Sequence, residues 1–248
     1  MRACFGTQSH EAIRACSLVI DGDRSNARRL ALAYFARGRA LSVEGRISEA
    51  IADLTKAVSL NSTLADAYSE RGRAEAMLNH LDQAIADSST AIRIDPGNYV
   101  YWYNCANALM RAGQLDLALQ DYSEAIKRNP KVAVLRMNRA IAFAQKGAPD
   151  RALDDFDEAV RLEPKNPDAY LNRGMLHRQM KDFPSAIADF DKAIELDAQN
   201  ADAYRERAAT LLVFGKRQAA IDDFQKALRF NPTDEESTHA LSELKTTP

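Results

Sequence analysis

The chain has 248 residues with 33 basic and 35 acidic side chains, so its formal net charge is −2. Because these charges form no long run of one sign, we expect no nucleic acid partner. No stretch reaches the roughly 18 apolar residues that a membrane-spanning helix needs, so we expect a soluble chain without membrane insertion.

Residues 1–30 combine a short helical pattern with a polar loop over 21–26. Apolar residues at positions 12, 13, 19 and 20 predict a helix over 9–20 that caps the N-terminal end of the fold. Charged residues among the first 14 interrupt any secretory signal. We expect a cytoplasmic protein if the chain begins at its native start, and a periplasmic or secreted one if a leader has been removed.

Three cysteines are present, without Cys-x-x-Cys and without a histidine at metal-binding spacing. Cys105 is expected to be an inert core thiol. Cys4 precedes the capping helix and could fold back onto Cys16. Two alternatives are open for this pair: a disulfide, which implies an oxidising compartment, or two free thiols in a reducing cytosol.

Residues 31–234 repeat with a period of 34. Ala-(Ile/Leu)-x-Asp recurs at this interval, beginning at Ala50, Ala84, Ala118, Ala152, Ala186 and Ala220. A second alanine follows seven residues later each time. Such a period is typical of a solenoid whose units bury their apolar faces against one another. The repeats are 31–64, 65–98, 99–132, 133–166, 167–200 and 201–234.

Each repeat predicts two amphipathic helices. In 167–200, Tyr170, Gly174 and His177 share one helix face, and Ala186, Phe190 and Ala193 share another, with a break between them. Residues 235–248 predict a C-terminal capping helix with Leu241 and Leu244 turned inward.

The repeats resemble the tetratricopeptide repeat (TPR) family. The aromatic residue at the fourth place of each repeat is found at Tyr34, Tyr68, Trp102, Tyr170 and Tyr204, with Arg136 in the fourth repeat. A small residue stands at the eighth place: Gly38, Gly72, Ala106, Ala140, Gly174 and Ala208. The resemblance implies an all-α, right-handed α-solenoid of six helix–turn–helix units. The Arg-Gly repeats and the capping half-repeat look like those of exported bacterial TPR proteins.

Arginine and aspartate recur at two further places. The seventh residue is Arg37, Arg71, Arg139, Arg173 or Arg207, with Cys105 as the exception, and the twenty-third is always aspartate: Asp53, Asp87, Asp121, Asp155, Asp189 and Asp223. We expect partly buried ion pairs within a repeat or between neighbours, and another partner for Asp121. Repetition in every unit favours a structural role over catalysis.

Motifs of catalysis are lacking. The sequence has no Gly-x-Gly-x-x-Gly, Walker, His-Glu-x-x-His or Gly-x-Ser-x-Gly motif, and its four histidines are isolated. We therefore expect no enzyme, no cofactor and no metal.

The TPR resemblance implies a concave surface formed by the first helices. The residues expected on it are Tyr103, Asn104, Asn107, Met137, Asn138, Ile141, Leu171, Asn172 and Met175. Amides at Asn104, Asn138 and Asn172 could pair with the main chain of an extended peptide. Alternatively, the asparagines bridge neighbouring helices and the apolar groups pack between repeats.

These features favour a scaffold that binds a protein or peptide in this groove. A substrate-presenting or regulatory subunit of a separate enzyme, and self-association into a homo-oligomer, are the alternatives. Binding of a chaperone's C-terminal carboxylate is disfavoured, because the cations of that clamp are missing and Asp168 would repel the ligand.

Overall fold

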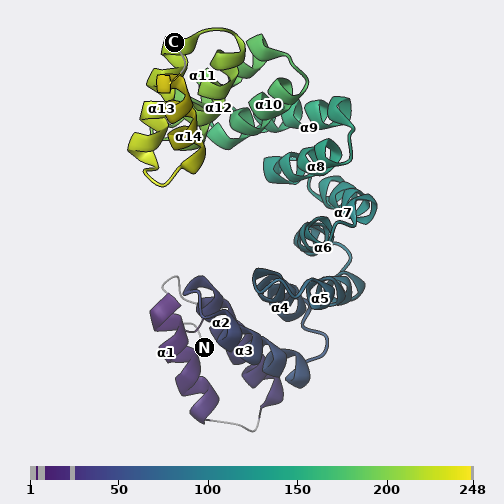
Figure 1. The fold of residues 1–248 in the computed structure, drawn as a ribbon. Helices are drawn as coiled ribbons and strands as arrows, with labels where there is room; N and C mark the ends of the chain where they lie inside the picture. The colour runs from purple at the N-terminus through teal and green to yellow at the C-terminus, as the bar shows by residue number, and fades with distance from the viewer. Residues whose placement is uncertain (1–3, 5–8, 23–25, 247–248) are drawn as a thin grey trace. The chain divides into compact units, whose positions relative to one another are not determined.

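All regular structure in the described part of the chain is helical. The structure is a computed structural model and describes residues 4, 9–22 and 26–246. Fourteen helices follow one another through these residues, with no strand among them (Figure 1). The expected all-α class is therefore confirmed. Of the predicted loop over 21–26, residues 21 and 22 instead belong to the first helix, and residues 23–25 lie outside the described residues.

The helices form two compact units that divide between Pro130 and Lys131. The first unit contains α1 (Ser9–Gly22), α2 (Ala27–Val43), α3 (Ile47–Leu60), α4 (Ala65–Met77), α5 (Leu81–Ile94), α6 (Tyr99–Arg111) and α7 (Leu115–Arg128). The second contains α8 (Ala133–Gln145), α9 (Pro149–Leu162), α10 (Pro167–Gln179), α11 (Phe183–Leu196), α12 (Ala201–Val213), α13 (Arg217–Phe230) and α14 (Glu235–Thr246).

Helices pack mainly against their neighbours in sequence. In the first unit α2 pairs with α3, α4 with α5 and α6 with α7, and in the second α8 pairs with α9, α10 with α11 and α12 with α13. Successive pairs also touch, as α3 does α4 and α11 does α12. Stacked pairs of this kind are the solenoid arrangement, in which each repeat contacts only its neighbours.

Small residues allow the two helices of a pair to approach closely. Both repeated alanines are at most 1% exposed in all six pairs. A Cβ atom at Gly174 would lie 2.7 Å from the ring of Phe190, which is itself fully buried. The place of Phe190 is filled in four other repeats by Leu54, Tyr122, Phe156 and Phe224. Close packing therefore explains why this place in α10 is a glycine.

The turn inside each helix pair contains one residue with positive φ. Four of these are Gly45, Gly113, Gly147 and Gly215, with φ of 72° to 76°. Asn79 and Lys181 take the same place in the other two repeats, with φ of 63° and 65°. Glycine adopts this conformation without steric cost, whereas lysine does not. The tight turn is thus retained even where glycine is replaced.

Each unit has one further helix that packs on a helix pair. At the N-terminal end α1 packs on α2, and at the C-terminal end α14 packs on α13. Leu241 and Leu244 of α14 lie against the cluster of Leu211 and Phe224, as the sequence predicts. These helices bury the apolar faces that the outermost pairs would otherwise expose.

Candidate functional site

Arginine–aspartate pairs join the two helices of five repeats. Each arginine donates from Nε and from one terminal nitrogen to both carboxylate oxygens of its aspartate, at 2.6–2.9 Å. The pairs, called the ladder below, are Arg37–Asp53, Arg71–Asp87, Arg139–Asp155, Arg173–Asp189 and Arg207–Asp223. Each pair lies within one repeat. Such two-pronged contacts fix geometry more strictly than single hydrogen bonds.

A third nitrogen of three ladder arginines reaches the preceding repeat. Arg71 donates to Thr55 at 3.2 Å, Arg173 to Asp157 at 2.8 Å and Arg207 to Asp191 at 2.5 Å, each from 16 residues further along the chain. One guanidinium therefore ties three helices together. This explains the recurrence of arginine, because lysine cannot present donors in this fork.

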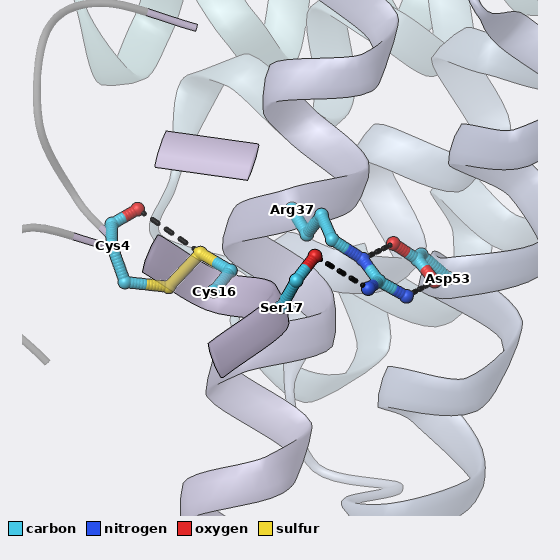
Figure 2. Close-up of a disulfide and its surroundings, with 5 residues drawn as sticks. All are labelled: Cys4, Cys16, Ser17, Arg37 and Asp53. Atoms are coloured by element: carbon cyan, nitrogen blue, oxygen red, sulfur yellow. Dashed lines mark hydrogen bonds and ion pairs between the residues drawn. A yellow bond between two sulfur atoms is a disulfide. The ribbon is translucent and has the colours of Figure 1, made fainter. Parts of the chain in front are cut away.

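At the N-terminal end the same contact reaches the capping helix. Arg37 donates to Ser17 of α1 at 3.0 Å and to Asp53 of α3 on its other side (Figure 2). The separation in sequence is 20 residues here, not 16. The longer α2, with 17 residues against 13 in α4, accounts for the difference, so α1 takes the place of the second helix of a repeat.

A disulfide between Cys4 and Cys16 completes this cap (Figure 2). Both cysteines are at most 1% exposed and share a cluster with Ile20, Ala33 and Ala36. The structure thus has the first of the two alternatives left open by the sequence.

The ladder is interrupted in the third repeat. Cys105 takes the ladder position that corresponds to Asp121, and its sulfur lies 3.9 Å from the Ser89 hydroxyl. Burial raises the pKa of the Cys105 thiol, and the carboxylate of Asp121 raises it further. Burial also raises the pKa of Asp121 above its usual range. Cys105 is therefore a protonated, buried thiol of low reactivity, and Asp121 lacks the guanidinium that the other five aspartates have.

Arginines from elsewhere compensate where the repeat pattern is broken. In the third repeat Arg128 lies 4.3 Å from the ring centroid of Trp102. In other repeats the ladder arginine takes that place, as Arg71 does over Tyr68 at 5.6 Å. In the fourth repeat Arg136, which replaces the aromatic residue, donates to Asp155 at 3.2 Å. The third and fourth repeats thus also have an arginine beside or at the fourth place of the repeat, although it comes from another position in the sequence.

A cavity of about 770 Å³ opens on the first-helix surface of the second unit. This cavity, called the first cavity, is lined by Ile141, Ala144, Gln145, Phe156, Asn172, Met175, Leu176, Arg178 and Gln179. Three of its residues, Ile141, Asn172 and Met175, were expected on the concave surface. Met175 is 39% exposed. The cavity thus combines apolar side chains with three amides.

Other residues expected on that surface do not line this cavity. Met137 is buried, whereas Leu171 and Asn138 are partly buried. In the first unit, the ring of Tyr103 lies 6.3 Å from that of Tyr122, whose hydroxyl donates to Asn107 at 2.5 Å. These residues therefore contribute to packing as well as to the surface.

The asparagines of this column are held in different ways. The Asn104 amide nitrogen donates to the Ser69 hydroxyl of the preceding repeat at 2.9 Å. The Asn172 amide nitrogen donates to the Asp168 carbonyl of its own helix at 2.8 Å. Bridging between helices, the alternative considered above, therefore holds for Asn104 and not for Asn172.

A second cavity, of about 500 Å³, was not predicted. It lies between α12 and the capping helix α14, and Arg178 lines both cavities. Its polar residues include Arg205, Glu206 and Glu236. Glu206 occupies the same place in its repeat as the asparagines do in theirs, which is the one sequence signal that could have indicated the site.

Within the described ranges, no helix combines the length and the apolar composition of a bilayer span. In the same residues, no three His, Cys, Asp or Glu side chains gather in a way that could hold a metal ion.

Stacked helix pairs with a regular 34-residue period define a helical-repeat protein of the class that serves as a protein interaction scaffold. Models described as tetratricopeptide repeat match residues 35–99, 103–168 and 167–200. The chain therefore belongs to the tetratricopeptide repeat family. No protein of curated function matches it.

Several solved structures share the fold. The APC/C hetero-tetramer Cut9-Hcn1 superposes with a TM-score of 0.76 at 19% identity, over 97% of this chain and 47% of that one. Pseudomonas aeruginosa pilF gives 0.74 at 21% identity, over 88% and 100% of the two chains. YrrB, described as a TPR protein with an unusual peptide-binding site, gives 0.59 at 22% identity, over 76% and 97%. The chain spans about half the length of the Cut9-Hcn1 match. At these identities the likeness shows the fold alone.

Proposed function

We propose that this protein is a non-catalytic scaffold that binds an extended segment of a partner protein in the first cavity. The observation that supports this most directly is the composition of the cavity wall. Ile141, Met175 and Leu176 offer apolar contact, whereas Gln145, Asn172 and Gln179 offer amides. An extended segment presents both apolar side chains and unpaired main-chain groups, so this wall complements it.

The hydrogen bond of Asn172 orients its amide for this purpose. Its nitrogen donates to the Asp168 carbonyl at 2.8 Å, which fixes the side chain along α10. The carbonyl oxygen is then available to accept a main-chain N–H of the ligand, whatever the side chains of that ligand are. Asn172 thus supports binding of an extended backbone, and Met175 beside it supports selection of an apolar side chain.

We propose that the residues expected on the concave surface of the first unit contribute less to the binding energy. Tyr103, Asn104 and Asn107 already contact neighbouring groups. We therefore place the main binding energy at Ile141, Asn172 and Met175. YrrB, a protein of the same fold with an unusual peptide-binding site, supports the class of ligand.

A displayed random peptide library tests this function. Peptides enriched on the protein are measured for affinity by fluorescence anisotropy against two variants, Met175→Gln and the matched control Met180→Gln. Both methionines are close to 38% exposed, but only Met175 lines the cavity. We expect Met175→Gln to weaken binding about tenfold, because it removes a buried apolar contact. Met180→Gln should leave the affinity unchanged.

Failure to enrich any peptide, or equal affinity for both variants and the native protein, would refute the assignment of the cavity.

A further inference from the structure

The second cavity has an apolar floor and a charged wall. Leu212, Phe224 and Ala240 line its floor, and they come from α12, α13 and α14. Glu206 and Glu236 lie on its wall beside Arg205 and Arg178. Because α14 forms one side, the capping helix does more than cover the last repeat.

Negative charge is in excess around this wall. Four carboxylates surround Arg205, those of Asp202 at 2.8 Å, Glu236 at 3.3 Å, Glu206 at 3.4 Å and Asp234 at 3.8 Å. The guanidinium of Arg178 lies 2.8 Å from Glu206. Among the residues that line the cavity, three carboxylates, those of Glu206, Glu236 and Glu243, outnumber the two guanidinium groups of Arg178 and Arg205, so a further cation would be favoured there.

Glu206 is the most buried of the carboxylates that line the cavity. The residue is 6% exposed, and its two carboxylate oxygens lie 3.4 Å from Arg205 and 2.8 Å from Arg178. A carboxylate oxygen can accept more than one hydrogen bond, so a donor that enters the cavity can be accepted alongside these guanidinium groups. The corresponding place in the preceding repeat is Asn172, which lines the first cavity.

We propose that the second cavity binds the lysine or arginine side chain of the same extended peptide that occupies the first cavity. This inference rests on the proposed function. The two cavities share Arg178, and α10 is in contact with α12. Packed helices lie about 8–10 Å apart and an extended chain advances about 3.3 Å per residue, so the apolar and the basic residue of the ligand are roughly three positions apart.

Synthetic peptides built on an enriched sequence test the charge preference. Each has a leucine and, three positions away, lysine, norleucine or glutamate. We expect affinity to fall in this order, with about a tenfold loss from lysine to norleucine. Glu206→Gln should abolish this difference while the norleucine peptide binds as before. The matched control is Glu70→Gln, which lies at the same place in the second repeat and should retain the preference.

The Glu236→Gln variant tests the charge preference even if the Glu206→Gln variant does not fold. The Glu236 side chain is 79% exposed, so its replacement should not disturb folding, and it should reduce the lysine preference two- to threefold. Peptides that bind and respond to Met175→Gln but show no preference for lysine would overturn this inference alone. The absence of any enriched peptide would instead overturn the proposed function.

Discussion

Four of the ladder arginines, Arg37, Arg71, Arg173 and Arg207, each connect three helices through one side chain. Arg71 bonds to Asp87 of its own repeat and to Thr55 of the preceding one, and its guanidinium lies over the ring of Tyr68. Its side chain is 14% exposed and that of Asp87 is 4% exposed. Pairs this buried add little net stability, because desolvation offsets their attraction, but removal of one partner is costly. The ladder therefore fixes the register of the helices.

Neutralising two aspartates of the same repeat position should have opposite effects. Asp87→Asn should lower the free energy of unfolding by about 3 kcal/mol, because it leaves the Arg71 guanidinium without its buried counter-ion. Asp121→Asn should raise that free energy at neutral pH, because burial disfavours the charged form of Asp121 and raises its pKa. Urea denaturation followed by circular dichroism measures both changes.

The gain from Asp121→Asn should depend on pH. The raised pKa means that the folded state holds the Asp121 proton more tightly than the unfolded state does. The charge of Asp121 therefore lowers the free energy of unfolding of the native protein only at pH values above the ordinary carboxyl pKa. This effect should vanish below the ordinary carboxyl pKa of 3.8, where both states are protonated. A stabilisation by Asp121→Asn that is equal at pH 3 and pH 7 would contradict this explanation.

Restoring the missing arginine is the converse test. Cys105→Arg should place a guanidinium beside Asp121 and lower the pKa of that carboxyl below its value in the native protein. Carbon-detected NMR titration of the aspartate side chains measures the shift. If the pKa of Asp121 stayed raised, the geometry of the other five pairs would not be reproduced in the third repeat.

Among the helices, α1 depends most on a covalent bond. It packs on α2, and the Cys4–Cys16 disulfide joins it to Cys4. Ser17 accepts a hydrogen bond from Arg37, so the ladder continues into the cap. Such a disulfide persists in an oxidising compartment.

Reduction of this disulfide should destabilise the cap locally. Closure of a short loop is worth about 2–3 kcal/mol, so reduction or Cys16→Ser should increase hydrogen exchange of the α1 amides by about two orders of magnitude. Amides of α4 and α5 should be unaffected, because each unit of a solenoid contacts only its neighbours. Unchanged exchange in α1 would show that packing alone holds the cap.

An element is easier to predict from the sequence when its residue pattern recurs in several repeats. The helix pairs were predictable because the same alanines and aromatic residues recur in every repeat. The pairing of Cys4 with Cys16 was not, since two cysteines 12 residues apart fix no distance until α1 is placed. The second cavity was missed because it depends on Glu206 meeting the unrepeated helix α14. Of the residues expected to bind a partner in the groove, Ile141, Asn172 and Met175 line the first cavity, whereas Met137, Asn138 and Leu171 do not, because side-chain contacts differ between repeats.

Over the whole molecule, residues that recur in the repeats stabilise the fold, whereas residues that differ between repeats are the ones available to bind a partner. The ladder and the alanines recur from repeat to repeat and face the helix interfaces, whereas the cavity residues differ between repeats. The net charge of −2 is small, so selection of a partner falls to local groups rather than to a general field. The central claim is that one such local site, the first cavity, holds an extended peptide.

Site-specific photo-crosslinking tests this claim most directly. A photoreactive methionine analogue is placed at position 175 or, as the control, at position 180, and the protein is irradiated with an enriched peptide. We predict crosslinks from position 175 that unlabelled peptide suppresses, and none from position 180. Crosslinks from position 180 alone, or none from position 175 under saturating peptide, would contradict the assignment of the binding site.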